Sequence, residues 1–118
     1  MSPFPRTLRV YSLDRTRSIA VEALVDTGSS YSMVPAPLLE ELGIAPEQEL
    51  RFILADERVM LQPVAEVQVE VEEQRTHTWC IFGTPDSQPL IGAYTLEGAR
   101  LMVDPVNERL VPLVGLLK

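Results

Sequence analysis

Short apolar or alternating segments, separated by polar turns, recur along most of the chain. The clearest alternation lies in residues 64–72, where Val67, Val69 and Val71 share one face and acidic or amide side chains occupy the other. A period of two residues is typical of a β-strand with one buried and one solvated face. The other segments expected to form strands are residues 7–11, 19–25, 76–82, 101–103 and 109–113.

Polar and proline-containing segments predict where the chain turns between these strands. Residues 14–17 connect the first two strands, and residues 85–89, with a proline at either end, break the chain before a short Leu-Ile-Gly element at 90–92. Two short helical segments are expected, at residues 37–42 and 95–99.

A further hairpin is predicted within residues 51–61. Its two arms, residues 51–54 and 59–61, are largely apolar, whereas the segment between them is polar. The exposed tip of this hairpin is expected at Ala55, Asp56, Glu57 and Arg58.

Size and composition favour one β-rich domain. The chain has 118 residues, which suits a single hydrophobic core, and its ten prolines are spread along its length and disfavour long helices. No tandem repeat or low-complexity linker divides the sequence. We therefore expect a single domain over residues 1–118 and an all-β fold.

Charge and hydropathy exclude several function classes. A formal net charge of −7 opposes binding to nucleic-acid phosphates, which requires clustered lysine and arginine. No apolar run approaches the roughly 20 residues needed to span a bilayer, and the first residues lack the apolar core of a signal peptide. The single cysteine, Cys80, allows no internal disulfide. We expect a soluble cytoplasmic protein without nucleic-acid or membrane partners.

The strongest candidate for chemistry is the run Asp-Thr-Gly-Ser-Ser at residues 26–30, directly after an expected strand. An Asp-Thr/Ser-Gly tripeptide alone arises by chance in on the order of one chain of this length in twenty. Here, however, the run follows an apolar Ala-Leu-Val, precedes Val34 and Pro35, and is accompanied by the late apolar element at residues 90–92. The combination is far more specific than the tripeptide.

This combination resembles the aspartic peptidases. Residues 26–30 with Val34 and Pro35 look like the active-site loop of the bilobal pepsin-like enzymes, whereas the length of the chain is similar to one subunit of the single-lobe retropepsin-like families. Residues 19–112 can be laid onto the plan of such a subunit, with its active-site loop, flap hairpin and late apolar-apolar-Gly element before a short helix. The resemblance implies a small closed β-barrel with one or two short helices.

The resemblance also implies an aspartic endopeptidase whose active site is completed by a second copy of the chain. Each subunit would supply one carboxylate, that of Asp26, because Asp86 and Ser87 are followed by Gln88 instead of glycine. Two carboxylates about 3 Å apart share one proton, so one can activate a water while the other stabilises the developing oxyanion. A homodimer, a peptide or protein substrate, and no metal or organic cofactor are therefore expected.

The same resemblance assigns roles to the residues around Asp26. Thr27 would reach across to the opposite loop and brace the pair, and Gly28 would let the backbone approach the carboxylates. A serine at position 29, as in pepsin-like enzymes, can donate a hydrogen bond to the catalytic carboxylate and favour its charged form, which predicts an acid-shifted activity optimum. The residues expected to contact the substrate are Ser29, Ser30, Tyr31, Ala55, Asp56, Glu57, Arg58 and Ile91.

Some residues depart from the retropepsin-like pattern. Glu57 stands in the hairpin turn where relatives tend to have glycine, and Ser30 and Ala93 stand where retroviral members have the Asp and Arg of a dimer contact. The apolar segment 113–117 is therefore another candidate for joining two subunits, with packing inside its own chain as the alternative.

Two other interpretations stay open. The fold could serve as a non-catalytic peptide-binding or dimerisation module, or the run at residues 26–30 could be an accidental turn in an unrelated β protein. A metal site at His77 and Cys80 is disfavoured, because residues three apart on a strand face opposite sides.

Overall fold

Nine β-strands and two short helices make up the fold, in a computed structural model that describes residues 2–115 and 117. The elements are, in chain order, β1 (Phe4–Tyr11), β2 (Ser18–Val25), β3 (Ser32–Pro35), α1 (Ala36–Glu41), β4 (Gln48–Ile53), β5 (Val59–Val71), β6 (Gln74–Gly83), β7 (Leu90–Ile91), α2 (Ala93–Gly98), β8 (Leu101–Asp104) and β9 (Arg109–Pro112). The predicted all-β class, with two short helices, is confirmed.

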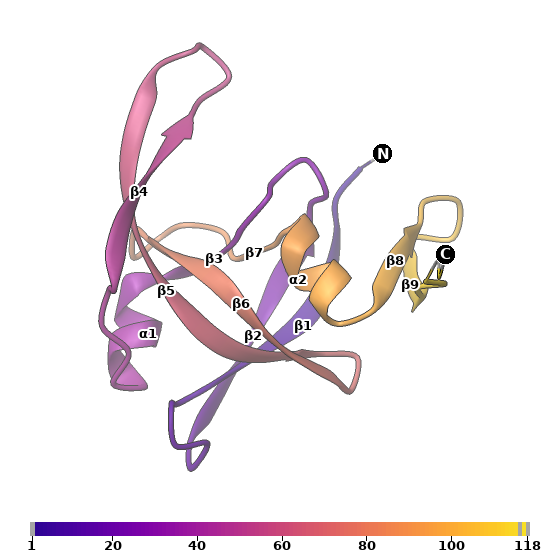
Figure 1. Cartoon of the computed structure of the whole chain (residues 1–118), viewed down its shortest axis with the longest axis horizontal. Coiled ribbons are helices and arrows are strands. Elements are labelled where there is room, and N and C mark those ends of the chain that lie inside the picture. Colours follow the sequence, from indigo (N-terminus) through magenta and orange to yellow (C-terminus); the bar gives the residue numbers. More distant parts are fainter. Residues whose placement is uncertain (1, 116, 118) are drawn as a thin grey trace.

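Seven strands form one curved sheet in the order β1-β2-β7-β3-β6-β5-β4, and residues 9–11 of β1 also pair with residues 68–70 of β5. Six strands therefore form a ring, from which β4 and the first part of β5 project as a long hairpin (Figure 1). The barrel is less completely closed than predicted. The reason is that β7 has only two residues and pairs with β3 at one position, where Leu90 meets Met33.

The buried face of this sheet forms the core, as the alternation along β5 predicts. Val67, Val69 and Val71 are each at most 1% exposed. Burying each of these side chains contributes about 1.5–3 kcal/mol relative to leaving it exposed. The helix α1 adds Leu39 to the same core and is followed by Gly43, whose φ of 75° lies in the left-handed region that favours glycine.

Two strands differ from the prediction. Residues 59–61 and 64–72 were expected to be separate, but β5 runs through Pro63 without a break. Proline is tolerated there because residues 59–63 pair with β4 alone, so the other side of the strand is free of ladder bonds. No element was predicted for the four residues of β3, because so short a segment carries no clear alternation.

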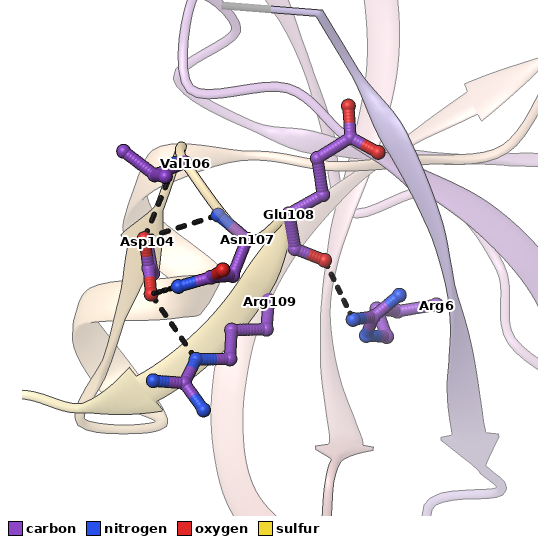
Figure 2. A network of polar contacts seen from close by, with 6 residues as sticks. All are labelled: Arg6, Asp104, Val106, Asn107, Glu108 and Arg109. Carbon is purple, nitrogen blue, oxygen red and sulfur yellow. Dashed lines mark hydrogen bonds and ion pairs between the residues drawn. The ribbon is translucent and has the colours of Figure 1, made fainter.

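The last two strands form a separate hairpin that is tied to β1 through its turn (Figure 2). A terminal nitrogen of Arg6 donates to the carbonyl oxygen of Glu108 at 2.8 Å. Within the turn, the Asp104 carboxylate accepts a hydrogen bond from the Asn107 side chain at 2.9 Å, and this bond is the main cause of the lowered pKa of Asp104. The Arg109 side chain donates to the same carboxylate at 3.1 Å. Polar contacts at its turn thus add to the packing of Leu101 and Leu110 in the core in holding the hairpin.

Candidate active site

The predicted catalytic loop begins where β2 ends. The backbone N–H of Asp26 donates to the carbonyl oxygen of Ile91 at 3.0 Å, which fixes the start of the loop against β7. The Asp26 carboxylate in turn accepts the N–H of Gly28 at 3.0 Å, and the Ser29 N–H donates to the Asp26 carbonyl at 3.1 Å. The side chain of Asp26 is half-buried. Its carboxylate is thus held in a tight turn and remains accessible.

The far side of the loop is bonded to the beginning of α2. The N–H groups of Ala93 and Tyr94 donate to the carbonyl oxygens of Ser29 and Ser30 at 2.8 and 3.1 Å. Gly92, just before the helix, lies so close to the loop that an added Cβ would be 2.6 Å from the Tyr31 carbonyl carbon and oxygen. Only glycine fits at that distance, because the atoms it would meet belong to the backbone. The late Leu-Ile-Gly element is therefore the support on which the Asp26 loop rests.

Three buried hydroxyl groups hold this support in place, and sequence reasoning missed them. The Ser32 and Thr95 oxygens are 2.6 Å apart, and the Thr95 and Thr78 oxygens are 2.9 Å apart. Ser32 also accepts the N–H of Gly92 at 3.0 Å. All three side chains are at most 5% exposed. The chain of hydroxyls links β6, α2 and β3 directly beneath the loop.

We expect Thr95→Val to lower the free energy of unfolding by about 1–3 kcal/mol, because it leaves the buried hydroxyls of Ser32 and Thr78 each short of a partner. Valine has nearly the same shape, so packing changes little. Urea unfolding of the purified chain measures the effect. Thr7→Val is the control, since Thr7 is exposed on β1. A loss of the same size in both variants would contradict the role of the hydroxyl network.

A groove of about 680 Å³ lies between the loop and the β4–β5 hairpin. Tyr31 lines it, with its ring 5.5 Å from the rings of both Phe52 on β4 and Tyr94 on α2. The Tyr31–Phe52 pair is edge-on, a favourable arrangement for aromatic rings. The other residues along the groove are Gly28, Ser29, Ser30, Met33, Leu50, Arg51, Ile53, Leu54, Gln62 and Ile81. The groove therefore presents both apolar and polar surface, with the carboxylate-bearing loop at one wall.

The sequence that forms this loop and groove matches a known protein family. The family model described as aspartyl protease matches residues 15–94, which is more than half of the chain. The chain belongs to the aspartyl protease family. A comparison with curated protein sequences gives no match.

Solved structures show the same fold for this aspartyl protease. The solution structure of simian foamy virus (mac) protease has a TM-score of 0.57 and 16% identity, over 80% of this chain and 92% of that chain. The foamy viral protease-reverse transcriptase, solved in complex with an RNA/DNA hybrid, has a TM-score of 0.56 and 16% identity. That match covers 96% of this chain and 13% of the longer viral chain. The retropepsin-like fold inferred from the sequence is confirmed.

The structure of this aspartyl protease separates the predicted substrate residues into two groups. Ser29, Ser30 and Tyr31 line the groove. The hairpin tip is exposed beyond the groove and contributes none of its lining among the described residues. The four tip residues are Ala55, Asp56, Glu57 and Arg58. The tip instead forms its own turn, in which Glu57 has a φ of 69° and Arg58 pairs with Asp56 at 2.6 Å.

Ile91 does not contact the groove with its side chain. The side chain is 0% exposed and lies in the core, so it presents no surface to the groove. Its carbonyl oxygen holds Asp26 in place instead. Leu50 and Phe52, on the inner face of the hairpin arm, take the position along the groove that was expected of the tip. In the sequence they belong to a run, residues 50–54, in which only Arg51 is polar, so no alternation distinguishes them from their neighbours.

The expectation for the Ser29 hydroxyl is wrong within this chain. Its oxygen donates to the carbonyl oxygen of Tyr31 at 2.8 Å, and not to the Asp26 carboxylate. The serine closes the turn between the loop and the residues that begin β3. An acid-shifted optimum therefore has no support from this side chain. Thr27, expected to brace the opposite loop, is exposed beside Asp26.

Cys80 and His77 lie on opposite faces of β6, as the spacing predicts. Cys80 is buried, and burial raises the pKa of its thiol to about 12, whereas most of the His77 side chain is exposed. Within residues 2–115 and 117, no three His, Cys, Asp or Glu side chains gather closely enough to hold a metal ion. In the same residues, no helix is long and apolar enough to cross a membrane.

Proposed function

We propose that this chain is one subunit of a homodimeric aspartic endopeptidase, with Asp26 of each copy forming the catalytic pair. The observation that carries the proposal is the accessible Asp26 carboxylate, fixed on a supported loop beside a groove lined in part by aromatic and aliphatic side chains. Membership of the aspartyl protease family supports the same reaction class. The sequence contains no second Asp-Thr/Ser-Gly run, so one chain alone holds half of such a site.

The chemistry of the proposed pair follows from the repulsion between two like charges. Two carboxylates within hydrogen-bonding reach keep one proton between them, so that one is a base and the other an acid. The base removes a proton from a water molecule, whose oxygen attacks the peptide carbonyl carbon. The acid donates to the carbonyl oxygen as negative charge develops there. Gly28, whose N–H bonds to the Asp26 carboxylate, would help to hold it in the reactive orientation.

The substrate in this proposal is an extended peptide with apolar side chains. Its backbone would lie along the groove between the loop and the β4–β5 hairpin, as extended peptides do beside strands. Tyr31, Phe52 and Leu50 offer apolar surface for alternate side chains. The exposed tip, residues 55–58, would close over the peptide only when the hairpin bends toward the loop.

The two copies would meet through apolar surface near the end of the chain. Leu113, Val114 and Leu117 are 41%, 81% and 101% exposed, and Leu116 lies outside the described residues. Covering such exposed apolar side chains with another surface lowers the free energy.

With a single buried thiol at Cys80 and no disulfide to maintain, the chain also suits a reducing compartment such as the cytoplasm.

The proposal predicts that activity per chain falls on dilution. A site shared between two chains disappears as dimers dissociate, so specific activity should follow the dimer fraction. Cleavage of a mixed peptide library, measured over a dilution series beside sedimentation analysis, tests this, with pepstatin as an active-site probe. Constant activity per chain in strictly monomeric material would reject the shared site. A dimer that neither cleaves peptides nor binds pepstatin would indicate a non-catalytic module.

A further inference from the structure

A second recess, smaller than the groove, lies on the outer face of the sheet near the end of β1. Its volume is about 150 Å³, and among the described residues it shares no lining side chain with the groove. Figure 1 shows the connection from β1 to β2, which supplies one wall, at the opposite end of the molecule from the hairpin tip. The polar residues that line it are Tyr11, Arg15, Gln68, Arg75, Thr76 and His77. Cationic side chains thus converge here in a chain of net charge −7.

Each of the two arginines is held through its Nε nitrogen. The Nε of Arg75 pairs with Glu70 at 3.2 Å, and its guanidinium lies 5.0 Å from the centre of the Tyr11 ring. The Nε of Arg15 donates to the side-chain oxygen of Gln68. Among residues 2–115 and 117, the terminal nitrogens of both guanidinium groups have no hydrogen-bond acceptor. Each arginine is therefore oriented with unused donors at the recess.

The floor of the recess is ordered by its own contacts. Tyr11, Gln68 and His77 lie opposite one another across β1, β5 and β6, so their side chains share one face. The Tyr11 hydroxyl donates to Glu70 at 2.8 Å, and this bond is the main cause of the lowered pKa of Glu70. Glu70 pairs with Arg75 but does not line the recess, whose charged lining residues in the described part of the chain are Arg15 and Arg75. His77 faces Glu66 at 3.6 Å on the outer rim.

We propose that this recess binds a phosphate group, either free or carried by a phosphorylated peptide. Planar guanidinium groups with free terminal nitrogens donate paired hydrogen bonds to phosphate oxygens, a geometry that lysine cannot reproduce. The recess is roughly five times the ~30 Å³ that one water molecule occupies, so it accommodates a tetrahedral oxyanion. The site requires neither Asp26 nor a second chain. The test of phosphate binding is therefore independent of the test of peptidase activity.

Calorimetric titration with inorganic phosphate, against a chloride control at equal ionic strength, tests the proposal on the full chain. We expect saturable binding that Arg15→Gln and Arg75→Gln each weaken about tenfold, the loss expected for a charge-assisted hydrogen bond. Arg75→Lys keeps the charge, removes the paired donors, and should also weaken binding. Asp26→Asn should bind phosphate like the unaltered chain.

Arg109→Gln is the matched control for Arg75→Gln. The two arginine side chains are 61% and 60% exposed, and their Nε atoms pair with carboxylates at 3.1 and 3.2 Å. Their removal changes the net charge equally, but Arg109 is not in the recess. Arg109→Gln should therefore leave phosphate affinity unchanged. An equal loss of phosphate affinity in both variants would mean that phosphate is attracted only by general charge, and this would overturn the site. The absence of saturable phosphate binding to the unaltered chain would also overturn it.

A phosphoserine peptide and its unphosphorylated form distinguish the two sources of the phosphate. Tighter binding of the phosphoserine peptide than of inorganic phosphate, lost in Arg15→Gln, would identify the peptide-borne group as the ligand. Equal affinity for the two would identify the free ion. Thermal melting of each variant verifies that the fold is intact, so that weaker binding reflects the recess itself.

Discussion

Peptide-bond hydrolysis is expected to fall by about 10²- to 10⁴-fold in Asp26→Asn, with the fold preserved. An amide cannot serve as the acid or base of the proposed pair, and positioned acid–base groups account for rate factors of this size. The amide oxygen can still accept the N–H of Gly28, which is 3.0 Å from the carboxylate. Steady-state cleavage of a peptide library measures the loss, and melting temperature verifies the fold.

Asp86→Asn is the matched control, because Asp86 is exposed and, like Asp26, is followed by a hydroxyl side chain. It should keep full activity. Mixing provides a sharper test of the shared site. Adding excess Asp26→Asn chain to the unaltered chain should lower its activity, since each mixed dimer has one carboxylate instead of two. Undiminished activity in the mixture, or in Asp26→Asn itself, would remove Asp26 from the mechanism.

Gly92→Ala is expected to abolish most activity and to lower the free energy of unfolding by about 1–3 kcal/mol, the usual cost of overpacking. The new methyl group would lie 2.6 Å from the Tyr31 carbonyl and 2.9 Å from the Ser29 carbonyl oxygen. These are backbone atoms, so the contact is relieved only by moving the loop away from α2. The Asp26 carboxylate would move with the loop.

The effect of Gly92→Ala can be separated from a general loss of glycine. Gly115→Ala adds the same methyl group at a position with no atom within 4 Å, so its stability should be unchanged. Urea unfolding and peptide cleavage are measured for both variants. If Gly92→Ala unfolds at the same urea concentration as the unaltered chain and cleaves peptides normally, the loop does not depend on this close approach.

The features that could be predicted from the sequence are those that leave a local signal. The valines of β5 alternate with polar residues because one face of the strand is buried, so the pattern specifies both the strand and its orientation. The run around Asp26 was recognisable because several of its neighbours matched a known loop. The same pattern could not show that β7 provides only one pairing with β3, since strand closure depends on residues far apart in the chain.

The features that could not be predicted depend on contacts between distant residues. Thr78 and Thr95 lie 17 positions apart, and nothing near either residue indicates that their hydroxyls meet in the core. The partner of the Ser29 hydroxyl was missed for a related reason. A carbonyl oxygen two residues ahead competes with the carboxylate, and the turn geometry decides between them. Phe52 on the hairpin arm meets the loop through Tyr31, a contact that only the folded chain displays.

The placement of β4 outside the ring of strands affects how a peptide substrate could enter the groove. β4 pairs with β5 alone, and its link to the Asp26 loop in the described chain includes the edge-on contact between Tyr31 and Phe52. Swinging this arm outward would separate these two rings, whereas the backbone bonds that hold Asp26 and its loop do not involve β4. A peptide could therefore enter the groove without unfolding of the whole protein. The hairpin arm would open locally, whereas the loop that holds the Asp26 carboxylate would stay rigid.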